Sequence, residues 1–173
     1  FDSFTYNLMH ICKKYVKHVD VIRVNQVNIK QLDKYEKIII SPGPGIPSDY
    51  PILFKILEKY EFKKSILGIC LGFQVIGVYY GGIIYNLNQV MHGKKSLVNQ
   101  IFDSESIYES IPNRFFVGRY HSWGIKLKDE KKLIITSKDT KGCIMSFRNK
   151  LNTIVGIQYH PESILTEYGD LIL

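Results

Sequence analysis

Residues 66–85 form a nearly unbroken apolar run in which Gln74 is the only strongly polar side chain. By length alone, such a run is a candidate for crossing a membrane. It contains five glycines, however, at Gly68, Gly72, Gly77, Gly81 and Gly82. Basic clusters do not closely flank both of its ends, as they often do beside a membrane span. A buried strand that turns directly into a buried helix produces the same hydropathy, so we favour a globular protein with no membrane association.

Strands and helices alternate through the first half of the chain. Apolar residues at helical spacing predict a helix capped at Asp2 or Ser3 that continues through residues 8–15, and a helix capped at Ser48 or Asp49 that continues through residues 53–60. A further helix is predicted over residues 71–80 and a short one over 29–35. Short apolar or alternating runs predict strands over residues 19–25, 37–41 and 65–69. Because strands that alternate with helices form parallel sheets covered on both faces, this half predicts an α/β fold with a mainly parallel, open twisted sheet.

The second half of the chain is richer in strands. Strand-like segments with little helix between them cover residues 82–87, 96–102, 114–123, 132–138, 143–149 and 153–160. Closely spaced strands favour antiparallel pairing, so we expect some of these to extend the sheet as antiparallel strands. Residues 164–173 are predicted to form a helix.

Composition narrows the class of protein further. The 173 residues carry neither a repeat nor a linker, so we expect a single domain over residues 1–173. The net charge of +7 comes from lysines scattered mostly as pairs, without a basic block or stripe, which argues against nucleic-acid binding. Three widely spaced cysteines form neither a disulfide framework nor a metal-binding motif. This usage suits a reducing compartment, and we expect a cytoplasmic protein that binds no metal or cofactor.

The segment Gly-Ile-Cys-Leu-Gly, residues 68–72, lies between the predicted strand at 65–69 and the predicted helix at 71–80. Its spacing matches the G-x-S-x-G nucleophile elbow, with the sulfur of Cys70 in place of a hydroxyl. Glycines two residues before and after the nucleophile allow the strand and the helix to approach closely. Free N–H groups at the helix start favour a thiolate, and the N–H of Leu71 can bind an oxyanion.

A nucleophile of this kind needs a base, and the base needs a group that orients it. His160 follows a predicted strand, at the end where open α/β sheets place their sites. Glu162 follows two residues later, beyond the rigid Pro161, and can fix the imidazole tautomer. The plainer interpretations are a cysteine that is only a small buried hydrophobe and a surface ion pair between His160 and Glu162. We interpret the other two cysteines, Cys12 and Cys143, as core residues.

Five segments together carry a resemblance to a known family. They are SPGPGIP (41–47), GICLGFQ (68–74), MHGK (91–94), RYHSW (119–123) and QYHPES (158–163). In order and separation they resemble class I, triad-type glutamine amidotransferases, which have a flavodoxin-like fold. More narrowly, they look like the glutaminase subunits of the chorismate-using synthases, namely anthranilate synthase component II and its relative in aminodeoxychorismate synthase. The opening DSFTYNL (2–8) also belongs to that pair.

The resemblance implies a function and a set of site residues. Cys70 would attack the side-chain amide of L-glutamine, and His160, oriented by Glu162, would manage the protons. The glutamine-binding positions of the family fall on Gly43, Pro44, Gly45, Leu71, Gln74, Ser122 and Trp123. The ammonia released would pass to a chorismate-binding synthase subunit, component I, which would make anthranilate for tryptophan biosynthesis. The same chemistry serving aminodeoxychorismate, and hence folate biosynthesis, is the alternative within the family. The resemblance implies no metal in this chain, because magnesium belongs to the partner.

The sequence departs from the family pattern at three places. Phe73 stands where many relatives have His or Met, and Trp123 stands where Leu is common. Relatives usually precede DSFTYNL with a strand of the type ILIIDN, so we expect the sequence to be a fragment that lacks the first strand. His92 and His121 match family motifs but remain outside the predicted catalytic set. A freestanding cysteine hydrolase and a non-catalytic flavodoxin-like binding module remain as competing hypotheses.

Overall fold

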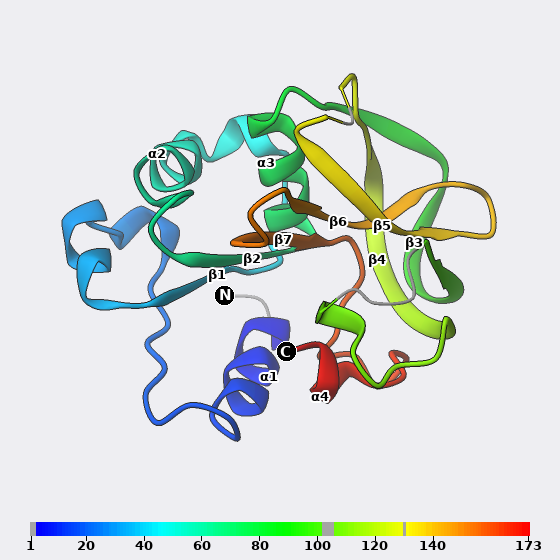
Figure 1. The fold of residues 1–173 in the computed structure, drawn as a ribbon, viewed down its shortest axis with the longest axis horizontal. Helices are drawn as coiled ribbons and strands as arrows, with labels where there is room; N and C mark the ends of the chain where they lie inside the picture. Colours follow the sequence, from blue (N-terminus) through cyan, green and yellow to red (C-terminus); the bar gives the residue numbers. More distant parts are fainter. Residues whose placement is uncertain (1–2, 102–105, 130) are drawn as a thin grey trace.

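The computed structural model describes residues 3–101, 106–129 and 131–173 (Figure 1). Its α-helices are α1 (Ser3–Cys12), α2 (Pro51–Tyr60), α3 (Leu71–Tyr79) and α4 (Gly169–Ile172). Short 3-10 helices are η1 (Val24–Gln26), η2 (Ile29–Lys34), η3 (Pro47–Asp49) and η4 (Ser106–Tyr108). The strands are β1 (Lys37–Ile40), β2 (Ser65–Ile69), β3 (Ile83–Gln100), β4 (Arg114–Lys126), β5 (Leu133–Asp139), β6 (Ile144–Asn149) and β7 (Ile154–Ile157). The predicted helices in the first half of the chain are therefore present, the short one over 29–35 as the 3-10 helix η2.

The seven strands form one mixed sheet in the order β1-β2-β7-β6-β5-β3-β4. Parallel pairing joins β1 to β2 and β2 to β7, whereas all the other neighbours pair antiparallel. The predictions of an α/β fold and of antiparallel strands in the second half are confirmed. The parallel part is smaller than expected, because it stops at β7. Strands joined by only a few residues, as β5 and β6 are, can pair only in the antiparallel sense.

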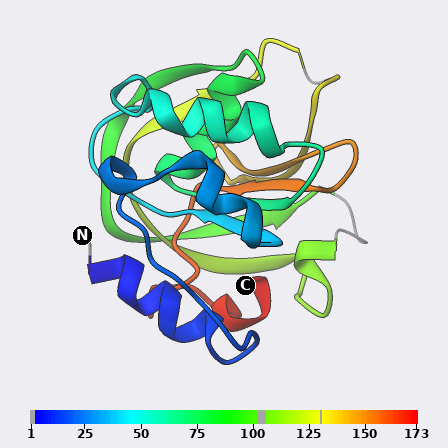
Figure 2. The ribbon, with the colours of Figure 1, turned by 90° about the vertical axis from the view of Figure 1, so that its left-hand side faces the viewer.

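Helices cover both faces of the parallel part of the sheet. In Figures 1 and 2, α2 and α3 lie on one side of β1, β2 and β7, and α1 and α4 lie on the other. Each side has its own apolar core. Leu57 on α2 and Ile76 on α3 are fully buried in the first, and Leu8 on α1 and Ile172 on α4 are buried in the second. The sheet thus separates two cores, as expected for an α/β fold.

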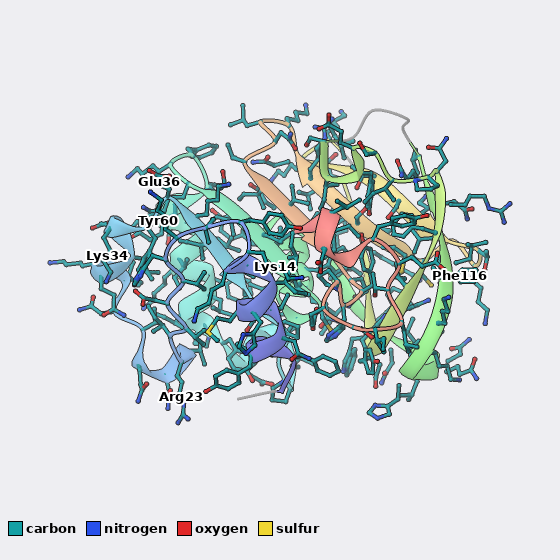
Figure 3. The ribbon with its side chains drawn as sticks, turned by 90° about the horizontal axis from the view of Figure 1, so that it is seen from below. Lys14, Arg23, Lys34, Glu36, Tyr60 and Phe116 are labelled. Carbon is teal, nitrogen blue, oxygen red and sulfur yellow. The ribbon has the colours of Figure 1, made fainter. Side chains whose placement is uncertain are left out.

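Lys14, at the end of the α1 segment, ties that segment to α4. Figure 3, which views the molecule from below, shows its side chain beside the carboxyl-terminal helix, and Lys14 Nζ lies 2.6 Å from Asp170 Oδ2. Because both side chains are about half exposed, this ion pair contributes little to stability. It joins the α1 segment to α4 on one side of the sheet.

The predicted strand over residues 19–25 is not formed. This segment runs without regular structure into η1, and β1 pairs only with β2 among the described residues. A strand needs a neighbour to pair its backbone groups, so an alternating apolar pattern alone does not produce one.

The predicted boundaries changed elsewhere too. The helix expected over 164–173 is limited to α4, and a series of turns precedes it. The strands expected over 82–87 and 96–102 are parts of the single long strand β3, although Phe102 lies outside the described residues.

Three neighbouring strands bring the predicted site together. The loop at 41–47 follows β1, Cys70 follows β2, and His160 follows β7 by three residues. Because β1, β2 and β7 are adjacent and parallel, their carboxyl ends lie at the same edge of the sheet. This is the edge at which open α/β sheets place their binding sites.

Candidate active site

Cys70 occupies the sharp turn between β2 and α3. Its backbone has φ 52° and ψ −97°, a conformation that non-glycine residues rarely adopt. Two hydrogen bonds hold the turn: Cys70 N–H donates to the Ile157 carbonyl at 2.9 Å, and Gln74 N–H donates to the Cys70 carbonyl at 3.1 Å. The geometry is that of a nucleophile elbow, in which a strained residue lies at the start of a helix.

The glycines on either side of Cys70 are required by close packing. A Cβ on Gly68 would lie 2.6 Å from the carbonyl group of Gly72, on the facing turn of α3. A Cβ on Gly72 would lie 2.9 Å from Ile40 Cβ and closer still to the Ile40 carbonyl oxygen on β1. These separations are shorter than atoms tolerate, so any side chain would push the strand and the helix apart. The spacing predicted from the sequence therefore has a steric cause.

His160 and Glu162 form a buried pair beyond the carboxyl end of β7. His160 Nδ1 lies 2.7 Å from Glu162 Oε1, and the two residues are only 2% and 9% exposed. A carboxylate accepts hydrogen bonds, so Nδ1–H of the imidazole donates. Nε2 of His160 makes no hydrogen bond within the part of the chain that the structure describes. The surface ion pair considered from the sequence is excluded, because both side chains are buried.

The pKa of His160 depends on its interactions with both Cys70 and Glu162. Burial opposes the charge on the imidazole, but its interactions with Cys70 and with Glu162 outweigh that effect and raise the pKa to about 9. The imidazole is therefore protonated at neutral pH.

Aromatic rings fix the plane of the His160 imidazole. The ring of Phe4, on α1, lies with its centroid 4.7 Å from that of His160, and the ring of Tyr120, on β4, lies at 5.0 Å. The hydroxyl of Tyr120 is 3.0 Å from Ser163 Oγ in the same loop. The His160 backbone is held by its N–H, which donates to the Gly118 carbonyl, and by its carbonyl, which accepts from Thr166 Oγ1.

The predicted glutamine loop packs against the start of α3. A Cβ on Gly43 would lie 3.1 Å from the Leu71 side chain, so this loop borders the first turn after Cys70. Two further contacts hold the loop in shape. Tyr50 OH donates to the Pro44 carbonyl at 2.9 Å, and Gly45 has a positive φ of 79° that only glycine adopts readily.

The remaining predicted binding residues come from α3 and β4. Gln74 Nε2 donates to the Trp123 carbonyl at 3.1 Å, which links the elbow helix to β4. Ser122 precedes Trp123 on that strand and is half-buried. Phe73, the departure from the family pattern beside Gln74, is fully buried and stacks on Phe147 with ring centroids 4.4 Å apart. Phe73 is thus a packing residue.

Three residues near the site were not singled out from the sequence, namely Phe4, Tyr120 and Gln158, and a fourth, His121, was named but left outside the predicted catalytic set. Tyr120 and His121 lie within RYHSW, and Gln158 begins QYHPES, so the motifs contained them without revealing what they contact. Phe4 comes from the opposite end of the chain and gave no local signal.

Cys12 and Cys143 are free and only partly buried, so their interpretation as core residues holds in part. In the described residues no cluster of three or more His, Cys, Asp or Glu side chains is arranged to hold a metal ion. The same residues contain no helix that is long and apolar enough to span a membrane.

Comparison with known proteins places this chain in a family. The model of the family described as glutamine amidotransferase class-I matches residues 1–173, so the chain belongs to the class I glutamine amidotransferases. The relatives include anthranilate synthase component 2 of Pyropia yezoensis, which is 41% identical over 100% of this chain and 93% of its own length. Anthranilate synthase component 2 of Methanocaldococcus jannaschii is 40% identical over 98% of this chain and 85% of its own length.

Solved structures support the fold. A Thermoplasma acidophilum protein assigned provisionally to GMP synthase superposes with a TM-score of 0.85, covering 99% of this chain and 85% of its own. At 22% identity this likeness concerns the fold alone. Together with the family match, it confirms the flavodoxin-like fold predicted from the sequence.

Proposed function

We propose that the chain is the glutaminase subunit of an anthranilate synthase, which hydrolyses L-glutamine and delivers ammonia to a chorismate-binding component I. The observation that carries this proposal is the elbow at Cys70, after β2, together with a buried His160–Glu162 pair held at 2.7 Å after the neighbouring strand β7. The raised pKa of His160 includes an interaction with the Cys70 side chain. The pathway rests on the full-length relatives named anthranilate synthase component 2.

The first half-reaction forms a thioester. The Cys70 thiolate attacks the side-chain amide carbon of glutamine, and the carbonyl oxygen becomes an oxyanion. The N–H of Leu71 and the backbone of the loop at Gly43 to Gly45 stabilise that oxyanion, and one such donor lowers a barrier by about 3 kcal/mol. As the C–N bond breaks, the protonated His160 gives its proton to the leaving nitrogen, and ammonia departs.

The second half-reaction returns the enzyme to its starting state. Neutral His160 takes a proton from water, the resulting hydroxide attacks the thioester, and the C–S bond breaks to release glutamate and the thiolate. Glu162 accepts the Nδ1–H hydrogen bond throughout, so that Nε2 is the atom that exchanges protons with substrate. The bound glutamine lies against Gln74 of α3 and against Ser122 and Trp123 of β4.

The test is glutamate release from L-glutamine by the chain and by its Cys70→Ala variant, each with and without component I plus chorismate. We expect release that depends on Cys70, that increases with the partner, and that accompanies anthranilate formation. Release that persists in Cys70→Ala, or no release by the wild-type complex, would refute the proposal. Robust hydrolysis that ignores the partner would instead favour a freestanding hydrolase, and aminodeoxychorismate as the product would place the chain in the other pathway.

A further inference from the structure

A chain of buried polar side chains connects the β5–β6 turn to the predicted glutamine site. Asp139, Arg119 and His121 are 6%, 1% and 6% exposed. Arg119 Nη1 donates to Asp139 Oδ2 at 2.6 Å, and Arg119 Nε donates to His121 Nε2 at 3.0 Å. His121 Nδ1 lies 2.7 Å from the Trp123 carbonyl oxygen. This series of hydrogen bonds thus ends at the backbone of Trp123, one of the proposed glutamine-binding residues.

The partners of His121 determine its tautomer. A guanidinium can only donate hydrogen bonds, so Nε2 of His121 must accept and carries no proton. A carbonyl oxygen can only accept, so Nδ1 must carry the proton and donate. Burial and the nearby Arg119 charge lower the pKa of His121 to about 3, which keeps the ring neutral. His121 is therefore a fixed donor aimed at the Trp123 carbonyl, and it is unsuited to exchanging protons with a substrate.

Arg119 is kept in place by Asp139, whose other carboxylate oxygen is also occupied. Asp139 Oδ1 accepts the backbone N–H groups of Lys141 at 2.9 Å and Cys143 at 2.8 Å. A buried ion pair contributes little net stability, and replacing it with apolar residues is often favourable. Arg119 Nη2 is moreover buried without a partner among the described residues. Burying the Arg119 guanidinium therefore costs free energy that an apolar side chain would not cost. The same guanidinium is suited to orienting the His121 ring.

The Trp123 carbonyl receives a second donor from the elbow helix. Gln74 Nε2 lies 3.1 Å from it and 3.3 Å from the side-chain oxygen of Gln158, two residues before His160. Two donors from different elements fix the orientation of the peptide group that follows Trp123. The Trp123 backbone is thereby held against α3, and the same Gln74 side chain also contacts Gln158 after β7.

We propose that His121, held as its Nδ1–H tautomer by Arg119 and Asp139, is a positioning residue that fixes the 122–123 backbone on which glutamine binds. This inference rests on the proposed function, and it assigns no proton-transfer step to His121. Loss of the Nδ1–H donor leaves Gln74 as the only remaining side-chain donor to the Trp123 carbonyl among the described residues. The consequence is weaker glutamine binding with largely intact chemistry at Cys70.

The kinetic test compares His121→Ala with His121→Asn in the complex with component I. Because the asparagine side-chain N–H can replace Nδ1–H, we expect His121→Ala to raise KM for glutamine about tenfold with kcat changed less than about threefold, and His121→Asn to restore most of the KM. Val117→Ala, a buried substitution on the same strand, controls for lost packing and should leave KM unchanged. An active His121→Ala with wild-type KM, or His121→Asn no better than His121→Ala, would overturn the positioning role.

A spectroscopic test on the wild-type chain avoids variants that fail to fold. Nitrogen-15 NMR of labelled histidine should show His121 as a neutral Nδ1–H tautomer that does not titrate between pH 5 and 8, because its pKa is lowered to about 3. An Nε2–H tautomer or a titration in that range would overturn the positioning role. If wild-type chain with component I releases no glutamate, the proposed function fails and the role in glutamine binding fails with it. Wild-type activity with a wild-type KM in His121→Ala refutes the positioning role alone.

Discussion

Cys70 combines a backbone strain with a particular electrostatic setting. A residue held in such a sparsely populated conformation costs about 1–3 kcal/mol, which the surrounding structure must supply. The strained conformation of Cys70 is stabilised by its hydrogen bonds to Ile157 and Gln74 and by the close packing of α3 against β1. In this conformation Cys70 lies at the N-cap of α3. Its side chain interacts with His160, whose pKa is raised to about 9.

Glu162→Gln tests the division of roles within the proposed triad. The neutral amide no longer stabilises the imidazolium, so the pKa of His160 should fall and the basic limb of the rate profile should move to lower pH. We expect kcat to fall by about 10²–10⁴, with residual activity above that of Cys70→Ala, because an orienting group costs less to remove than the nucleophile. The measurement is glutamate release across pH 6–10. A larger loss in Glu162→Gln than in Cys70→Ala would contradict these roles.

At the scale of elements, the site depends on how closely β1, β2 and α3 approach one another. Gly68 and Gly72 allow that approach, and Phe73 and Ile76 on the same helix fill the core beside it. The approach brings the loop after β1 next to Leu71, on the helix that follows Cys70. A change in the packing of α3 should therefore affect stability and catalysis together.

Gly72→Ala tests this coupling. Its methyl group would overlap the backbone of β1, so we expect a loss of about 2–4 kcal/mol in the free energy of unfolding together with loss of glutaminase activity. Gly142→Ala is a matched control, because Gly142 has a positive φ of 84° but nothing within 4 Å of a built Cβ. We expect that control to cost about 1 kcal/mol from φ alone and to retain activity. Urea unfolding of both variants makes the comparison, and equal stability losses would refute the steric account.

Local rules in the sequence predicted the elements that depend on neighbouring residues. The glycines around Cys70 and the His160–Pro161–Glu162 segment carry their geometry within a few residues, so their motifs predicted the sharp turn at Cys70 and the contact between His160 and Glu162 that the structure contains. Residues 19–25 were predicted wrongly, because strand formation needs a partner that local alternation does not reveal. The contact of Arg119 with Asp139 could not be predicted, since it joins β4 to the end of β5, two strands that β3 separates in the sheet.

At the scale of the whole molecule, the sheet lies between two apolar cores, and the candidate site lies at the edge of the sheet where residues of both cores are neighbours. Cys70 belongs to the apolar cluster that contains Leu8 and Tyr159, whereas Leu71, the next residue, belongs to the cluster on the opposite face. The chain therefore crosses from one core to the other at Cys70. Because folding raises the pKa of His160, the stability of the fold is linked to the protonation of this residue.

The pH dependence of stability should report that link. His160 has a folded pKa of about 9 against about 6.5 in an unfolded chain, so its protonation stabilises the fold below about pH 6.5 and this stabilisation is lost as pH rises through about 9. We expect the advantage of wild type over His160→Gln in the free energy of unfolding to shrink by about 1–3 kcal/mol between pH 6 and pH 10. Urea unfolding at several pH values measures it, and an advantage that grows with pH would show that the sign is wrong.

The most direct test of the account is anthranilate synthesis by the complex of component I with the Cys70→Ser variant, supplied with either glutamine or ammonia. The account predicts that synthesis from glutamine is abolished while synthesis from ammonia matches that of the wild-type complex, because Cys70 serves only to release ammonia. Loss of both activities would show that Cys70 is needed for the structure of the complex. Retention of glutamine-dependent synthesis would show that Cys70 is not the nucleophile, and the central claim would be wrong.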